Sequence, residues 1–222
     1  MVKRVVSIGA HSLDAELLGG PLLLKYSKAG AHCSTWHVTQ GRLEDPNANE
    51  EEKEAYLKKL LDQNEAAAKV LGADTKWLGY VSSTMPSTED FAKRLEEDLA
   101  DVDLVITHWK GSAHPRHVNT HDAVTSAVKN MRLKGSNIKL MYGETFEDLQ
   151  SFMPQAYFTL TDEEAETWFK ALKCYTVFNG GVNDLPYNEY YSSIMKVHEF
   201  EANTNKKTVA YMYASLIENE LF

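Results

Sequence analysis

The chain is poor in cysteine and has neither a long apolar run nor an excess of basic residues. Its 222 residues include two cysteines, Cys33 and Cys174, without the spacing of a zinc finger or a redox motif. A disulfide framework is therefore not expected, and a reducing cytoplasm fits this composition. No window approaches the roughly 18 apolar residues of a membrane span, and the apolar run at the amino terminus is too short for a signal peptide.

The charge balance is acidic, with 23 basic residues against 32 acidic ones and a net charge of −9. Because nucleic acids and anionic membranes attract basic patches, this balance disfavours both as partners. The hydrophobic fraction of 43% is enough for a sizeable core. We therefore expect a soluble protein that forms one domain over residues 1–222 and acts on a small molecule. Whether it forms a homo-oligomer stays open.

Short apolar runs alternate with helical patterns along most of the chain. Strands are expected at 4–8, 32–39, 76–81, 102–107, 138–142 and 157–160, and helices at 14–29, 50–71, 91–99, 117–133 and 161–174. Such alternation predicts βαβ units. The expected fold is α/β, a Rossmann-like three-layer sandwich with a mainly parallel sheet. The pattern beyond residue 180 is ambiguous.

Two segments carry residues of the types that bind metals in proteins. His11 and Asp14 follow the first predicted strand, and His114 and His117 follow the fourth. In a doubly wound sheet these strands flank the point where the strand order reverses, and ligands bind there. Imidazole and carboxylate are good zinc ligands, and three of them leave a fourth position open for catalysis. We predict a site for one divalent metal ion, zinc in the first place, made by His11, Asp14 and His117.

Taken singly, these residues have ordinary explanations. His11 alone could be a hydrogen-bonded strand end, Asp14 a helix cap, and His117 and His121 two exposed positions one helical turn apart. It is their placement together that favours the metal site. His108 has no partner that the sequence identifies and is given a structural role, as are His32, His37 and His198.

Both segments resemble signatures of the LmbE/PIG-L family of zinc-dependent N-deacetylases. The first is similar to Ala-His-Pro-Asp-Asp-x-Glu followed by Gly-Gly, and the second to His-Pro-Asp-His; the matching residues are Ala10, His11, Asp14, Glu16, Gly19, Gly20, His114, Pro115 and His117. The resemblance covers roughly residues 4–175, and residues 180–222 are expected to extend the same domain. It implies that His11, Asp14 and His117 bind one zinc ion. It also implies that His114 stabilises the oxyanion or protonates the leaving amine.

Three positions depart from the family pattern. Leu13 stands at the position of the family's general base, and Arg116 at the position of the acid between the two histidines. Asp62 stands where the family has a substrate-binding arginine. Leucine cannot accept a proton, and a positioned base contributes a factor of about 10²–10⁴ to the rate. Arg116 should also disfavour the protonated form of His114.

The resemblance leads to one function and one alternative. The leading hypothesis is hydrolysis of an amide, the N-deacetylation of an N-acetyl amino sugar or its conjugate. It requires a substitute base, for which Glu44 and Asp45 are candidates, although an ordinary exposed loop pair explains them more simply; Asp122 is a further candidate. The alternative is a non-catalytic metal-binding or sugar-binding relative. A nucleotide-binding protein is rejected, since the first loop lacks Gly-x-Gly-x-x-Gly.

Aromatic residues are frequent in the last third of the chain. Core packing explains them best, because aromatic side chains dominate core burial. A sugar pocket and a subunit interface are the alternatives. The residues concerned are Trp168, Phe169, Tyr175, Phe178, Tyr187, Tyr190 and Tyr191.

Overall fold

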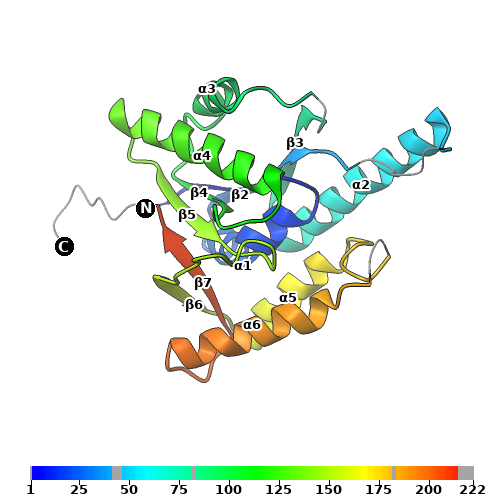
Figure 1. The fold of residues 1–222 in the computed structure, drawn as a ribbon. Helices are drawn as coiled ribbons and strands as arrows, with labels where there is room; N and C mark the ends of the chain where they lie inside the picture. Colours follow the sequence, from blue (N-terminus) through cyan, green and yellow to red (C-terminus); the bar gives the residue numbers. More distant parts are fainter. Residues whose placement is uncertain (1, 42–46, 82–83, 182–183, 215–222) are drawn as a thin grey trace.

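A seven-stranded sheet runs through the middle of the computed structural model, which describes residues 2–41, 47–81, 84–181 and 184–214 (Figure 1). The strand order is β3-β2-β1-β4-β5-β7-β6. The first five of these strands pair in parallel, and β7 is antiparallel to both of its neighbours. The strands are β1 (Arg4–Gly9), β2 (His32–Thr39), β3 (Asp74–Tyr80), β4 (Leu104–His108), β5 (Lys139–Gly143), β6 (Ala156–Thr159) and β7 (Thr208–Tyr213).

Helices cover both faces of the sheet. On one face α3 and α4 pack together over a core of mainly aliphatic side chains. On the other face α1, α2, α5 and α6 enclose a second, more aromatic core, and Figure 1 shows the two groups on opposite sides of the strands. The helices are α1 (Asp14–Lys28), α2 (Glu50–Leu71), α3 (Thr88–Asp98), α4 (Pro115–Leu133), α5 (Asp162–Leu172) and α6 (Tyr187–Glu201). The predicted α/β sandwich with a mainly parallel sheet is confirmed.

Element boundaries differ where local capping decides them. The α3 helix begins at Thr88, three residues before the predicted start, because the Ser87 side chain accepts a hydrogen bond from the Asp90 N–H. Two elements, α6 and β7, lie in the part of the sequence whose pattern was ambiguous. Since β7 inserts between β5 and β6, the end of the chain completes the sheet rather than extending its edge.

The Gly19-Gly20 pair inside α1 permits close packing and does not end the helix. A Cβ atom at Gly19 would lie 2.4 Å from Ser7 Oγ on β1, and one at Gly20 would lie 2.7 Å from Trp168 Cδ1 on α5. The pair therefore marks a close contact between elements and not a helix boundary. These contacts bring α1 against both the sheet and α5.

The late aromatic residues belong to the core, as predicted. Five of them are buried, namely Trp168, Tyr175, Phe178, Tyr187 and Tyr191, and the other two are partly buried against the same cluster. Both cysteines are free thiols. In the described residues, no helix combines the length and the apolar character needed to cross a membrane.

A buried histidine ties α6 to the end of β5. His198 is 3% exposed; its Nε2 contacts the Glu144 carboxylate, and its Nδ1 lies 2.6 Å from Glu201 Oε2. Burial alone would lower the pKa of His198, but the two carboxylates outweigh burial and raise it. His198 is therefore a structural residue, as the sequence suggested.

This arrangement makes the stability of the protein depend on pH. The folded protein raises the pKa of His198, so the contacts of His198 with its two carboxylates contribute fully to stability below the pKa of the unfolded chain, near 6.5. This contribution is lost as pH rises through the pKa of His198 in the folded protein. We expect His198→Gln to lower the melting temperature more at pH 6 than at pH 9, measured by circular dichroism. The control is His32→Gln, which removes an exposed histidine bonded to Asp74. An equal loss at both pH values would contradict the prediction.

Candidate metal centre

The first part of the centre is the turn that connects β1 to α1. A Cβ atom at Gly9 would lie 2.4 Å from the backbone nitrogen of Ala15 and 2.6 Å from Asp14 Cβ, so only glycine lets the chain fold back this tightly. Within the turn, Asp14 Oδ2 accepts a hydrogen bond from the His11 N–H at 2.8 Å and lies 3.1 Å from His11 Nδ1. The turn therefore fixes the imidazole and the carboxylate beside each other.

The second part is the start of α4. His114 is its N-cap residue and Pro115 its first residue, a position that suits proline because the missing N–H has no helical partner. His117 lies in the first turn, is 1% exposed and points its Nε2 atom at Asp14 Oδ2, 3.4 Å away. The imidazole rings of His11 and His117 have centroids 5.5 Å apart. The two distant loops meet, as the sequence analysis predicted.

A buried carboxylate from a third segment holds the imidazoles. Asp148, in the segment 144–155 after β5, is fully buried and accepts hydrogen bonds from two rings. Its Oδ1 lies 2.8 Å from His117 Nδ1, and its Oδ2 lies 2.7 Å from His108 Nδ1. Both rings therefore carry a proton on Nδ1, and each presents its Nε2 atom to another partner.

The Nε2 atoms of these rings have different partners. His108 Nε2 accepts the backbone N–H of Ala10 at 3.0 Å. The Nε2 of His117 faces Asp14 instead. Two overlapping groups, His11–His114–His117 and Asp14–His108–His117, each have possible ligand atoms within 4.8 Å of one another. Because the Ala10 N–H already binds the Nε2 atom of His108, the donors that remain for a cation are those of His11, Asp14 and His117. His114 lies beside them.

The charges of the cluster favour a cation. Burial by itself would raise the pKa of Asp14, but His117 and the hydrogen bonds from the neighbouring imidazoles hold it well below its usual value. Burial opposes protonation of His117, yet Asp14 and Asp148 outweigh it and raise the pKa of His117 to about 10. The carboxylates thus favour positive charge at this position, whether a proton or a metal ion carries it. The donor set and its tautomers fit a divalent metal.

His114 differs from the other histidines of the cluster. Its Nδ1 accepts the backbone N–H of Arg116 at 3.3 Å, so its proton resides on Nε2. Burial and the neighbouring His11 and His117 lower the pKa of His114 to about 4. The sequence analysis predicted the direction of this shift but named Arg116 as its cause. In the structure, burial and the neighbouring imidazoles cause it. His114 is therefore a neutral hydrogen-bond donor.

A second carboxylate stands at the open side of the cluster. Glu147 Oε2 lies 3.8 Å from His117 Nε2, and its side chain is 35% exposed. Burial raises the pKa of Glu147, with His117 acting in the opposite direction. The sequence analysis singled out neither Glu147 nor Asp148, because both lie in a segment without a recognised motif. His108 was given a structural role, although its place at the end of β4 beside β1 was a signal that it lies close to His11 and Asp14.

Other residues named from the sequence lie apart from the cluster. Asp62 is exposed on α2 and pairs with Lys58 at 2.8 Å. His121 is buried and its Nδ1 donates to the His108 carbonyl at 2.9 Å, so the alternative explanation of an exposed helix position does not apply to it. Glu44 and Asp45 lie outside the described residues.

A buried acid on α1 supports the loop that carries His11. Glu16 is fully buried, and its Oε1 lies 3.5 Å from His37 Nε2. Burial would lower the pKa of His37, but Glu16 outweighs it and raises the value. His37 in turn donates from Nδ1 to the His11 carbonyl at 3.2 Å. Glu16 and His37 therefore fix the backbone of His11 from β2.

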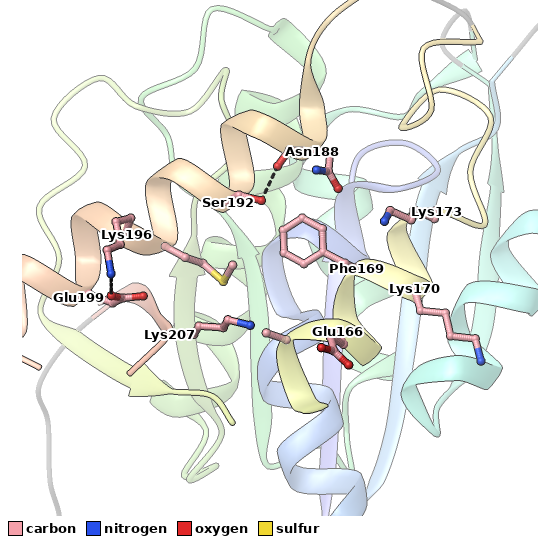
Figure 2. A pocket seen from close by; sticks show the side chains of 11 residues that line it. Glu166, Phe169, Lys170, Lys173, Asn188, Ser192, Lys196, Glu199 and Lys207 are labelled. Atoms are coloured by element: carbon pink, nitrogen blue, oxygen red, sulfur yellow. Dashed lines mark hydrogen bonds and ion pairs between the residues drawn. The ribbon is translucent and has the colours of Figure 1, made fainter. Parts of the chain in front are cut away.

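A separate groove of about 740 Å³ lies between α5 and α6. Figure 2 shows Phe169 of α5 in it, with the Lys196–Glu199 pair on α6 at one end. None of the histidines or carboxylates of the metal cluster lines this groove. The groove and the cluster are therefore separate features.

These observations define a class of protein, namely an α/β protein with a cluster of histidines and carboxylates, of a composition that suits a metal ion, at the carboxyl ends of β1 and β4. Comparison then gives the family. The model of the PIG-L family, described as GlcNAc-PI de-N-acetylase, matches residues 6–128. The chain belongs to this family. No curated protein matches the chain.

Solved structures share the fold at low sequence identity. The hydratase GalB, the 4-carboxy-2-hydroxymuconate hydratase from Pseudomonas putida KT2440, is 13% identical with a TM-score of 0.80, and 99% of each chain is covered. The N,N'-diacetylchitobiose deacetylase from Pyrococcus horikoshii is 20% identical with a TM-score of 0.72, covering 96% of this chain and 84% of that one. The A40926 pseudoaglycone deacetylase Dbv21 is 19% identical with a TM-score of 0.71, covering 96% and 97%.

The Asp148 carboxylate should determine how well the centre binds metal. Asp148→Asn keeps the size of the side chain but removes the charge that orients His117, and the loss of such an outer partner typically weakens metal affinity about 10–100-fold. We expect a loss of that size for zinc, measured by competition with a chromophoric chelator. Asp122→Asn is the matched control, because Asp122 is a partly exposed carboxylate on α4 that pairs with Lys110. Equal zinc affinity in the wild type and Asp148→Asn would refute the role of Asp148.

Proposed function

We propose that this protein is a metal-dependent hydrolase that removes the acetyl group from an N-acetyl amino sugar or its conjugate. His11, Asp14 and His117 would hold one divalent ion, zinc in the first place, because nitrogen and oxygen donors in an open three-residue set suit that metal. The observation that carries the proposal is the orientation of His117: Asp148 binds its Nδ1, and its Nε2 faces Asp14 3.4 Å away. Membership of a family described as a de-N-acetylase supports the reaction type.

Each residue of the centre has a task in this reaction. When bound, the ion polarises the amide carbonyl and lowers the pKa of the attacking water toward about 7. His114, neutral and protonated on Nε2, donates a hydrogen bond to the carbonyl oxygen as negative charge develops there. Asp148 keeps His117 in the tautomer that binds a cation. His37, from β2, holds the backbone carbonyl of His11 in place.

Figure 1 helps to explain where the substrate would approach. The α1 and α4 helices begin at the same edge of the sheet, where β1 and β4 end. The side chains of His11 and Glu147 are 29% and 35% exposed there, whereas His108 and Asp148 are fully buried. The substrate therefore meets His11, His114 and Glu147 first.

The two free cysteines support our placement of the reaction in the cytoplasm.

A second candidate function is the addition of water to a carbon–carbon double bond. The specific observation in its favour is that the hydratase GalB covers 99% of this chain at a TM-score of 0.80, whereas the chitobiose deacetylase gives 0.72. Both reactions use water as the attacking molecule, so the substrate decides between them.

A panel of substrates tests the proposal. We expect purified protein to contain about one zinc ion per chain and to release acetate from at least one N-acetylated amino sugar, measured by a coupled acetate assay. His11→Ala should lose both the bound zinc and the activity, because it removes a donor. His32→Ala is the matched control, since this exposed histidine contacts Asp74 instead of the cluster.

Other outcomes are equally informative. Hydration of an unsaturated dicarboxylate without acetate release would favour the second candidate. Stoichiometric zinc without either reaction, together with a gain of activity in Leu13→Asp, would identify a metal-binding relative that has lost its base. The absence of zinc in the wild type, with no effect of His11→Ala, would remove the metal centre itself.

A further inference from the structure

The family's proton acceptor is missing from its usual place in this chain. Leu13 occupies that position, and its side chain is 4% exposed within the core cluster of α1 and α5. Hydrolysis of an amide requires a group that takes a proton from the attacking water, and a positioned base contributes a factor of about 10²–10⁴. If the proposed function is correct, another group must be able to accept this proton.

Among the described residues, four carboxylates lie at or directly behind the metal cluster, and three of them are already engaged. Asp14 faces His117 as a metal donor. Both oxygens of Asp148 accept hydrogen bonds from imidazoles, at 2.8 and 2.7 Å. Glu16 is fully buried behind the loop and faces His37. Glu147 remains.

Glu147 has the position that the role requires. Its Oε2 lies 3.8 Å from His117 Nε2, the atom that faces the metal position, so the carboxylate borders the space between the donors. Its side chain is 35% exposed, which leaves it open to water and to a substrate. Its backbone is held in place, because Glu147 N donates to Thr145 Oγ1 at 3.3 Å and the next residue, Asp148, is anchored to two histidines.

We propose that Glu147 is the catalytic carboxylate of this protein and replaces the acid that Leu13 has displaced. This inference rests on the proposed hydrolase function. The water oxygen bonds to the acetyl carbon while Glu147 takes one of the water protons. The carbon–nitrogen bond then breaks, and the proton passes from Glu147 to the leaving amine. One water is consumed, and one acetate and one amine are released.

Acetohydroxamate tests this role without turnover. It resembles the acetyl group bound together with the attacking oxygen, and a carboxylate that can accept its hydroxyl proton strengthens its binding. In zinc-loaded protein, we expect Glu147→Gln to weaken acetohydroxamate binding at least tenfold while its zinc affinity stays within twofold of the wild type. Titration calorimetry measures the first quantity, and chelator competition the second.

Matched variants separate the role of Glu147 from a general effect of charge. Glu163→Gln makes the same chemical change at an exposed position in the first turn of α5 and should alter neither affinity. Glu44→Gln and Asp45→Asn test the two carboxylates that the sequence analysis named as candidates. Unchanged acetohydroxamate affinity in Glu147→Gln overturns the inference, and so does a loss of zinc, because Glu147 would then be a metal ligand.

Rescue provides the second measurement. Any polar side chain at position 13 loses the packing of leucine, so two variants of similar shape are compared in the Glu147→Gln background. Leu13→Asp adds a carboxylate, and Leu13→Asn loses the same packing without adding one. The backbone supports this comparison, because φ at Leu13 is +84° and aspartate and asparagine tolerate positive φ better than leucine. We expect Glu147→Gln to reduce acetate release at least 100-fold, Leu13→Asp to raise it again at least tenfold, and Leu13→Asn to restore none.

The failures of the two proposals can be distinguished. Absence of acetate release by the wild type counts against the hydrolase function, whereas the hydroxamate comparison still decides the role of Glu147. Full activity of Glu147→Gln alongside an active wild type overturns the assignment of Glu147 and leaves the hydrolase function standing.

Discussion

The arrangement of the histidine–carboxylate cluster depends on one buried carboxylate. Asp148 accepts hydrogen bonds from His117 on α4 and from His108 at the end of β4, and His108 in turn accepts the Ala10 N–H of the loop after β1. Three segments that are distant in the sequence are thereby linked through a single side chain. A buried carboxylate without partners would be costly, so its two imidazoles and its position stabilise one another. The tautomer of His117, and with it the direction in which its Nε2 atom points, follows from this network.

Much of this arrangement follows from local rules that the sequence displays. Alternating strands and helices give a sheet whose reversal point lies between β1 and β4, and the observed order places those two strands side by side. His11, Asp14 and His117 could therefore be grouped correctly in space. Glycine at position 9 makes the required turn possible, which is a steric constraint that a sequence expresses through one residue type.

The remaining features depend on tertiary contacts that no local pattern contains. Asp148 and Glu147 come from a segment without regular structure, whose place is set by backbone contacts such as Gln150 N to the Gly111 carbonyl. His198 contacts Glu144 only because α6 packs back over the end of β5. The pairing of β7 between β5 and β6 likewise joins strands far apart in the chain. Contacts of this kind are decided by packing, so periodicity and spacing could not predict them.

Leucine at position 13, where the family signature that this chain resembles has an acid, has a physical explanation in the same turn. A positive φ at a non-glycine residue costs of the order of 1–3 kcal/mol, and full burial of a leucine side chain contributes roughly 1.5–3 kcal/mol. Leu13, 4% exposed, therefore offsets the strain of the turn by packing into the core. An aspartate there would tolerate the backbone better but would bring a second carboxylate close to Asp14. The turn thus keeps His11 and Asp14 side by side without a carboxylate at position 13. Glu147, from a different loop, is the carboxylate that stands at the open side of the cluster.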